Sequence, residues 1–312
     1  MQNANVLKQK RSNKIKRGKG ESVFMWIMFA LFLFYALSVI LPFLWMIMNS
    51  LKSNGEFFEN WNSFPSRLKF ENYADAFEKI NYNDTNLIGM FFNSVILTVE
   101  NTLAAVIFPL MTAYVIAKYP YKFCKFLYGL ALVVQVLPTI GSLPVEYKLV
   151  YDLGINDNFF LIWILSAGSF SFNFLILYAG FRSVSWTYAE SAMIDGAGHY
   201  TVFFKIMLPQ AKPFITAIAI TTFISQWNNY NTPFLYLDRY PTMALGLYDF
   251  QQKQLYGTQM APLFAGIILS VLPVAVLFTA MQKPLWKTPL PAALKADFCG
   301  RKRFTKTKNM IE

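Results

Sequence analysis

The chain alternates between long apolar runs and short polar segments in which its charges gather. A helix needs about 20 mostly apolar residues to cross the hydrocarbon core of a bilayer. Six runs reach that length, at residues 23–48, 90–117, 123–143, 159–180, 214–235 and 260–282. Backbone groups in lipid need internal partners, so runs of this length indicate helices rather than short alternating strands. The predicted fold is an all-α, polytopic membrane protein with six transmembrane helices.

Composition supports a membrane protein and charge suggests its orientation. Of the 312 residues, 55% are hydrophobic and 14% are charged, which argues against a soluble domain. If the N-terminus lies inside, 21 of the 28 Lys and Arg residues fall on inside segments. Both termini are therefore predicted to be cytoplasmic. The chain divides into a basic tail (1–22), a membrane domain (23–283) and a second basic tail (284–312).

The basic tails account for most of the net charge of +11. Beside a membrane span, such a tail is typical of a topology signal that rests on anionic lipid, and no nucleic-acid partner is expected. The first apolar run is too long for a signal peptide and is interpreted as a retained anchor. Cys124 and Cys299 both fall on the predicted cytoplasmic side, so no disulfide is expected.

Two polar segments outside the runs have helical character. In the outer loop (52–89), Tyr73, Phe77 and Ile80 have helical apolar spacing, and Asn72 is a possible N-cap of a short surface helix. The second segment, at residues 186–213, lies between the fourth and fifth runs and contains "TYAESAMIDGAGHYTVFFKIMLPQAKP".

Thr187 and Glu190 in this second segment have the spacing of a capping box, which predicts a helix start. Ala189, Ala192, Met193 and Gly196 then share one small-sided face. Gly196 and Gly198 can end the helix in a left-handed turn, and Pro213 opens the next span. The expected result is two short helices joined at a bend below the membrane. The small face could enter a groove of another protein, or the segment could lie on lipid.

The same segment resembles the signature of permease subunits of bacterial ABC importers. That signature reads E-A-A, three residues, G, nine residues, I-x-L-P, and here it is Glu190-Ser191-Ala192, Gly196, Ile206 and Leu208-Pro209. The departure is Ser191, where Ala is usual. Within it, "AMIDGAG" resembles the form found in carbohydrate permeases. Further stretches, among them "LPFLWMIMNSLKS", "EYKLVYDLGINDN" and "QWNNYNTPFLYL", resemble maltose-type permeases, over residues 41–281.

The resemblance implies a coupling helix between the fourth and fifth spans that docks into a cytoplasmic ATPase. The docking residues carried over are Glu190, Ser191, Ala192, Asp195, Gly196, Ala197, Ile206, Leu208 and Pro209. The implied partners are a second six-helix permease, a different chain, together with two ATPase copies and an extracellular solute-binding protein. ATP and Mg would bind to the partner ATPases and no cofactor to this chain, which would lie in the bacterial plasma membrane.

Enzyme chemistry has little support in the sequence. No G-x-x-x-x-G-K-[ST] run is present to cradle phosphates, so the chain cannot hydrolyse ATP itself. His199 is the only histidine, which leaves no persuasive catalytic triad or histidine metal site. No catalytic or metal-ligating residue is predicted, and the chain is not expected to be an enzyme.

Polar residues near or within the spans are candidates for a substrate path. Glu100 is the one clear ionisable residue in a span, and it could contact a polar solute or stabilise helix packing. Six amides could bind sugar hydroxyls or join helices, namely Asn93, Gln135, Asn173, Gln226, Asn228 and Asn229.

Two function classes compete with the importer subunit. A secondary transporter driven by an ion gradient would be expected to show inverted repeats and paired intramembrane charges, and neither is clear here. An integral membrane enzyme would need a catalytic cluster near a span end, and the sequence offers none. The sequence therefore favours the transmembrane subunit of an importer for a carbohydrate, with an oligosaccharide as the expected solute.

Overall fold

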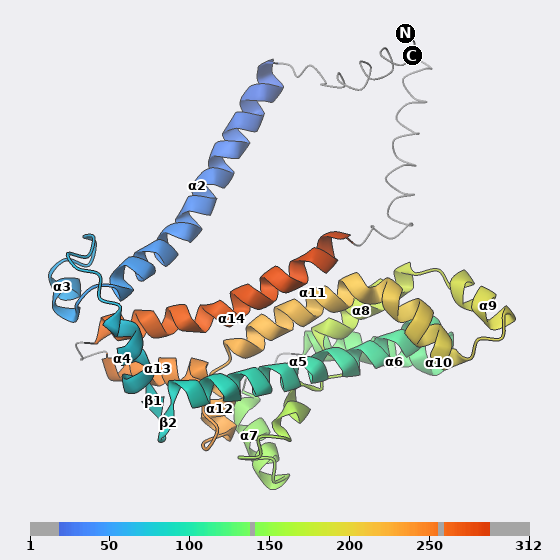
Figure 1. Ribbon diagram of the computed structural model, residues 1–312. Helices are drawn as coiled ribbons and strands as arrows, with labels where there is room; N and C mark the ends of the chain where they lie inside the picture. Colours follow the sequence, from blue (N-terminus) through green and yellow to red (C-terminus); the bar gives the residue numbers. More distant parts are fainter. Residues whose placement is uncertain (1–18, 138–140, 255–258, 288–312) are drawn as a thin grey trace.

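The computed structural model describes residues 19–137, 141–254 and 259–287 (Figure 1). The α-helices are α2 Lys19–Ser50, α3 Asn54–Glu59, α4 Glu71–Lys79, α5 Leu87–Lys118, α6 Lys122–Val136, α7 Leu143–Asp152, α8 Phe172–Ser183, α9 Thr187–Ile194, α10 His199–Val202, α11 Leu208–Trp227, α12 Asn231–Tyr236, α13 Met243–Lys253 and α14 Met260–Lys287. A 3₁₀ helix, η2, covers Ile162–Ser166, and a π-helical turn, η3, covers Phe203–Met207. Most of both predicted basic tails lies outside the described residues, and their orientation stays a prediction.

The predicted all-α fold holds for the described residues apart from one antiparallel hairpin. It is formed by two short strands, β1 Asn81–Tyr82 and β2 Thr85–Asn86. Its turn residues, Asn83 and Asp84, have φ of 43° and 61°. Asn and Asp tolerate this left-handed region better than most residues, which is why a two-residue turn can form here.

In the described part of the chain, four helices are long and apolar enough to cross a membrane. They are Gly20–Ser50, Leu87–Lys118, His199–Trp227 and Met260–Ala280, and they overlap the first, second, fifth and sixth predicted spans. The predicted count of six continuous helices is not confirmed. The third run forms α6, whose 15 residues extend about 22 Å, which is less than the thickness of a typical hydrocarbon core.

The fourth predicted span, 159–180, is broken. It forms η2 in its first half and α8 in its second half. Between them lies Ala-Gly-Ser-Phe-Ser (167–171), and Gly and Ser favour turns and caps over helix interiors. The fifth predicted span also ends early, at Trp227, because Asn229 turns the chain. Its Oδ1 accepts a hydrogen bond from the Thr232 amide at 3.2 Å, and α12 begins there.

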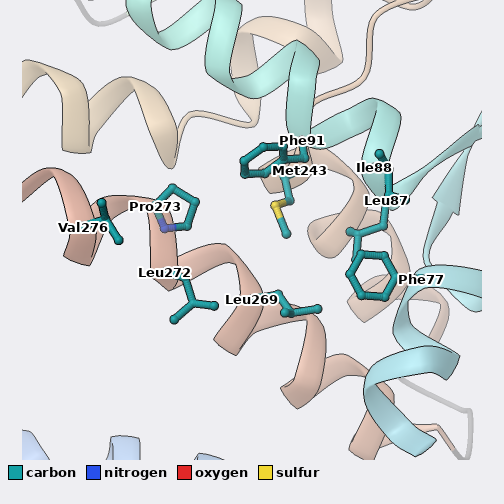
Figure 2. Close-up of a pocket in the computed structure, with 9 residues that line it drawn as sticks. All are labelled: Phe77, Leu87, Ile88, Phe91, Met243, Leu269, Leu272, Pro273 and Val276. Atoms are coloured by element: carbon teal, nitrogen blue, oxygen red, sulfur yellow. The ribbon is translucent and has the colours of Figure 1, made fainter.

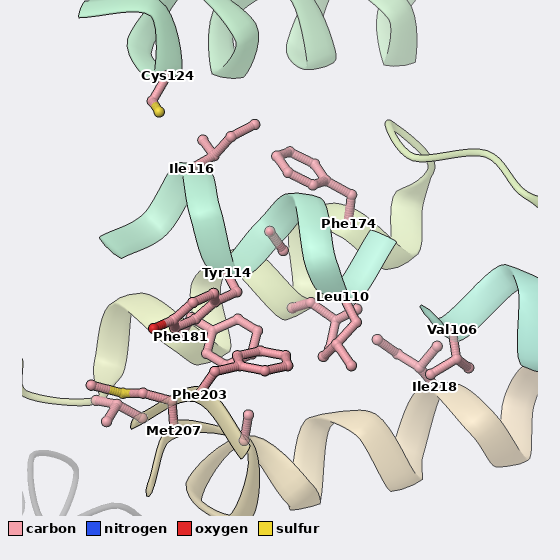
Figure 3. Close-up of a cluster of buried hydrophobic side chains, with 14 of the residues drawn as sticks. Val106, Leu110, Tyr114, Ile116, Cys124, Phe174, Phe181, Phe203, Met207 and Ile218 are labelled. Atoms are coloured by element: carbon pink, nitrogen blue, oxygen red, sulfur yellow. The ribbon is translucent and has the colours of Figure 1, made fainter. Parts of the chain in front are cut away.

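Helix α5 lies at the centre of the bundle and packs against α8, α11, η2 and α13. At its C-terminal end, a cluster of buried side chains joins α5 to α8 and η3 (Figure 3). The Tyr114 ring lies 5.4 Å from the Phe181 ring and 4.6 Å from the Phe203 ring, measured between centroids. Cys124 is a buried free thiol in this cluster, whereas Cys299 lies outside the described residues.

Helix α2 departs from the bundle (Figure 1). Its 32 residues extend about 48 Å, and nearly all of its side chains up to Leu44 are exposed. Contacts gather at its C-terminal end, where the Trp45 ring lies 5.5 Å from Phe264 of α14 and 6.2 Å from Trp61. Among residues 19–137, 141–254 and 259–287, α2 therefore finds its packing partners at its C-terminal end.

The loop after α2 is fixed by buried polar groups. The predicted N-cap of α4, Asn72, is wrong, because Phe70 is the N-cap residue. Instead, Asn72 is buried and donates hydrogen bonds to the carbonyls of Ser50 and Lys52, both at 2.7 Å. The Lys52 amine is also buried and donates to the Asn60 carbonyl at 2.9 Å. Burial lowers the pKa of Lys52, while the nearby Glu56 carboxylate opposes that shift.

Candidate functional site

Helix α9 starts at Thr187, as predicted, but without the predicted capping box. Its N-cap is Trp186, whose carbonyl accepts hydrogen bonds from the amides of Ala189 and Glu190 at 2.8 and 3.1 Å. Ser185 Oγ accepts from the Thr187 amide at 3.3 Å. The helix therefore begins one residue earlier than a capping box at Thr187 requires, and Glu190 is left exposed.

Helix α9 ends in a left-handed turn at Gly196, which has φ of +85°. The Gly196 amide donates to the Met193 carbonyl at 3.0 Å, and the Ala197 amide donates to the Ala192 carbonyl at 2.9 Å. This pair of bonds is a Schellman motif, which favours Gly at that position. Gly198 does not share this role. Its φ is −73°, and it precedes α10 as the N-cap.

The second half of the segment is not a separate short helix. Residues from His199 to Trp227 form one helix that includes the π turn η3. In that turn the Leu208 amide donates to the Phe203 carbonyl, five residues earlier. Pro209 follows directly. It has no amide hydrogen to donate, and its ring would crowd the carbonyl of Lys205 in a regular helix. The π turn relieves that conflict, so residues 199–207 continue directly into the candidate membrane span of α11.

The small face of α9 points into the protein. Ala189 is fully buried, and Ala192 and Met193 pack against the cluster of Figure 3. Three of the four residues of this face therefore contact the core of this chain, while Gly196 is exposed, and docking of the segment into another protein stays a prediction. Of the docking residues carried over from the family signature, Glu190, Ser191, Asp195, Gly196 and Pro209 are exposed, and Ala192, Ala197, Ile206 and Leu208 are half-buried.

Four exposed large apolar side chains at residues 186–213 were not predicted as surface groups, namely Tyr188, Ile194, Tyr200 and Phe204, and two of them stand out. Ile194 is 86% exposed and Tyr200 is 83% exposed. Ile194 ends α9 and Tyr200 lies in α10, on either side of the Gly196 turn, and large exposed apolar groups are typical of interaction surfaces. Ile194 lies off the small face of α9, and that offset was the available signal.

The segment at residues 186–213 is tied to the C-terminal end of α5. The Tyr119 hydroxyl and His199 Nδ1 are hydrogen-bonded at 3.1 Å. The Lys118 amine donates to the Val184 carbonyl just before α9. A displacement of α9 would therefore reach α5 through two polar contacts in addition to the aromatic cluster.

A polar pocket of about 390 Å³ lies between α5, η2, α8 and α11. Its lining residues are Ala105, Leu165, Ser166, Asn173, Thr221, Thr222, Ser225 and Gln226. Asn173 Nδ2 donates to the Ala105 carbonyl at 3.1 Å and lies 3.4 Å from Thr222 Oγ1. Gln226 Nε2 lies 3.5 Å from Ser166 Oγ. Hydroxyls and amides of this kind can exchange hydrogen bonds with a neutral polar solute.

Two residues of this pocket, Asn173 and Gln226, were predicted from the sequence as substrate-path candidates. Thr221, Thr222 and Ser225 form a polar face with Gln226 on α11, at i, i+1, i+4 and i+5, and that periodicity could have found them. Ser166 had no such signal because it lies in a 3₁₀ helix.

The other predicted substrate-path residues lie elsewhere. Asn93, Gln135 and Asn228 donate to the carbonyls of Pro241, Phe170 and Ile224 at 3.0, 2.6 and 2.8 Å. Asn229 turns the chain before α12. Glu100 is half-buried, and among the described residues its Oε2 is shielded without a hydrogen-bond partner. None of these five side chains lines the polar pocket.

Comparison with known proteins identifies a matching family and similar transport proteins. Residues 16–285 match the family described as "Binding-protein-dependent transport system inner membrane component". The chain is 32% identical over 258 residues to the diacetylchitobiose uptake system permease protein NgcG of Streptomyces coelicolor, covering 81% of this chain and 83% of that protein. It is 28% identical to the melibiose/raffinose/stachyose import permease protein MelC of Bacillus subtilis, covering 78% and 87%.

Solved structures agree on the fold. A chain of a bacterial ABC transporter involved in the import of the acidic polysaccharide alginate has a TM-score of 0.72 at 22% identity, covering 86% of this chain and 99% of that chain. With a match over most of its length, this chain belongs to the family of binding-protein-dependent transport system inner membrane components.

Proposed function

We propose that this chain is the transmembrane permease subunit of an ATP-driven ABC importer for a carbohydrate. The observation that carries the proposal is the structure of residues 186–213, the coupling segment. It is exposed at Glu190, Ile194 and Asp195, and its Ala189 is buried against the bundle core. Such a segment can bind a cytoplasmic protein through its exposed side chains and can transmit a displacement to the helices on which it packs. The names of the relatives support a sugar as the solute, and we propose an oligosaccharide.

The proposed assembly contains four further proteins. A second, different six-helix permease, two copies of a cytoplasmic ABC ATPase and an extracellular solute-binding protein would complete the importer in the bacterial plasma membrane. A solved alginate transporter with a periplasmic protein bound to alginate pentasaccharide supports the last of these, at a TM-score of 0.52 and 16% identity. ATP and Mg would bind to the ATPases.

The proposed mechanism couples two regions of this chain. Closure of the ATPases would displace α9 and, through Tyr119 and the Tyr114 ring, the C-terminal end of α5. Helices α5, α8 and α11 also line the polar pocket, so the same movement would change the pocket's shape. Asn173 and Gln226 would exchange hydrogen bonds with the passing solute.

Co-purification tests this assembly. The chain would be isolated from its native membrane in mild detergent and its partners identified by mass spectrometry. Recovery of a P-loop ATPase and a second six-helix protein is expected. If the chain were recovered alone and transported its solute in liposomes without ATP, it would be a secondary transporter and the proposal would fail.

A glycine pair tests the geometry of the coupling segment. Gly196→Val places a β-branched residue at φ +85°, whereas Gly198→Val places it at an ordinary φ, and both sites have open space for a Cβ. Backbone strain is of the order of 1–3 kcal/mol at Gly196 only. We expect Gly196→Val to lose most ATPase recovery and Gly198→Val to retain it. If the ATPase were recovered equally with both variants, docking would not depend on the Gly196 turn.

A further inference from the structure

The polar pocket between α5, η2, α8 and α11 has no charged side chain among the described residues that line it. Its six polar lining residues carry only hydroxyl or amide groups, namely Ser166, Asn173, Thr221, Thr222, Ser225 and Gln226. These groups can donate or accept, so the solutes that fit depend on the bonds that the groups already make. The direction of a bond is known wherever one partner is a backbone group, because a carbonyl only accepts and an amide N–H only donates.

The hydroxyl proton of Ser166 is bound by Asn101 of α5. Asn101 Nδ2 donates to the Leu97 carbonyl at 2.8 Å, which identifies the other atom of its amide as the acceptor Oδ1. Ser166 Oγ is therefore the donor in its hydrogen bond to Asn101 Oδ1. Asn101 is 3% exposed and does not line the pocket. Ser166 is left with oxygen lone pairs, so it can offer the pocket an acceptor.

Gln226 is oriented from the other side of the pocket. The Thr232 amide donates to Asn229 Oδ1 at 3.2 Å, so Asn229 Nδ2 is the donor to Gln226 Oε1, at 3.4 Å. Gln226 Nε2 therefore lies toward Ser166 Oγ, at 3.5 Å. The two series of hydrogen bonds meet there in matching directions, with Gln226 as donor and Ser166 as acceptor. A contact of 3.5 Å is longer than an ordinary hydrogen bond, so a closer donor from a solute can replace it.

Two further side chains of the pocket are fixed as acceptors. Asn173 Nδ2 donates to the Ala105 carbonyl at 3.1 Å and lies 3.4 Å from Thr222 Oγ1, which occupies both of its hydrogens. The Asn173 Oδ1 atom is left to accept. The Thr221 hydroxyl donates to the Ala217 carbonyl one turn earlier, at 3.1 Å, so its oxygen also accepts.

Three fixed acceptors favour a solute that donates hydrogen bonds. A sugar hydroxyl can donate to each of these oxygens, and it can accept in turn from the Gln226 amide or from the hydroxyls of Thr222 and Ser225. A carboxylate can only accept. Beside the three acceptor oxygens it would meet opposed lone pairs, and the pocket has no cation to pair with its charge, which makes its burial costly.

We propose that the polar pocket selects a neutral, hydroxyl-rich solute over an acidic one, and that Asn101 sets this preference by fixing Ser166 as an acceptor. Asn101 is a positioning residue, because it acts through Ser166 and lies outside the pocket. This inference rests on the proposed function and narrows its solute from carbohydrates in general to uncharged ones.

Protection of a cysteine reporter tests the pocket directly. Leu165 lines the pocket, and its apolar side chain takes no part in these hydrogen bonds. Leu165→Cys would be labelled with a maleimide in the full complex, co-purified with its partners and placed in bilayer nanodiscs. Mass spectrometry of the peptide that contains residue 165 distinguishes this label from any on Cys124 or Cys299.

The two probes are raffinose and its counterpart in which the primary alcohol of the galactose unit is oxidised to a carboxylate. They have the same size and differ in one group. Raffinose is expected to slow the labelling of residue 165 several-fold at a concentration at which the acid has no effect.

Two neighbouring variants separate the role of Asn101 from general packing. Asn101→Leu keeps the size of the side chain and removes the acceptor, so the Ser166 proton is free to turn into the pocket. Protection by raffinose should fall several-fold and protection by the acid should rise, whereas a packing defect would weaken both. Thr102→Val is the control, because Thr102 is also buried on α5 and its hydroxyl has no partner among the described residues. Protection by both probes should stay unchanged in this control.

Ser166→Ala keeps the proposal testable if Asn101→Leu does not fold. It removes the acceptor itself, so it should weaken protection by raffinose without producing protection by the acid. Unchanged protection by raffinose in Ser166→Ala would contradict the proposal.

Three results would overturn the inference. Equal protection by both probes would show that the pocket does not select against charge, and an unchanged preference in folded Asn101→Leu would show that Asn101 does not set it. Protection by neither probe would mean that the pocket is not a solute site. The proposed function is judged separately, by recovery of the P-loop ATPase in the same preparation, so the two failures can be distinguished.

Discussion

The two ends of α5 are packed differently. At the C-terminal end, Tyr114 touches Phe181 and Phe203, and the coupling segment is tied to Tyr119. At the N-terminal end, α5 borders an apolar groove that side chains of α4, α13 and α14 also line (Figure 2), and its neighbour α14 is held through α4 and α13. A close-packed interior transmits strain. The C-terminal end of α5 is therefore the end at which a displacement of a neighbouring element would reach this helix most directly.

The largest expected difference between the ends is in stability. Phe181→Ala removes a fully buried ring and should lower the free energy of unfolding by about 3–5 kcal/mol. Phe77→Ala, at the groove end, removes a ring that is 41% exposed and should cost roughly half as much or less. Thermal unfolding in one detergent would compare the variants. Equal losses would mean that both ends are packed alike.

A smaller effect is expected from the contact between α5 and the coupling segment. Tyr119→Phe removes the hydrogen bond to His199 and should cost about 0.5–1.5 kcal/mol. Hydrogen exchange of residues 186–202 should rise in this variant. Tyr121→Phe is the control, because Tyr121 stacks on Tyr119 and is 65% exposed. Unchanged exchange in Tyr119→Phe would show that the aromatic cluster alone holds the segment.

The smallest effect is expected in the loop after α2. Hydrogen bonds from the Ser66 amide at 2.6 Å and hydroxyl at 2.8 Å lower the pKa of Glu56 from its ordinary value of 4.5. Because the folded pKa is the lower one, this stabilisation is complete above pH 4.5 and is lost as the pH falls through the folded pKa. The pH dependence of hydrogen exchange in residues 53–69 would measure it.

Glu56→Gln should remove that pH dependence, and Glu59→Gln, on an exposed neighbour, should retain it. If the loop of the Glu56→Gln variant still opened on acidification, another titratable group would be responsible for the pH dependence. Because Glu56 and the Ser66 groups that bond to it both lie in the loop after α2, the loop should respond without unfolding of either end of α5.

Sequence by itself determined the features that depend on local rules. Four spans follow from the length of apolar runs, since each helix satisfies its own backbone in lipid. The turn at Gly196 follows from the tolerance of glycine for a positive φ. The signature around Glu190 indicated the family that the comparisons confirm.

Only the tertiary structure decided the features that depend on distant partners. Asn72 could cap a helix by local rules, but buried carbonyls at Ser50 and Lys52 require its amide. The small face of α9 turns inward because the bundle core offers it more apolar contact than water does. The polar pocket draws on four elements, and the groove of Figure 2 is the space that four helices leave between them. Periodicity within one segment contains no information about such separations, because they are set by side chains far apart in the chain.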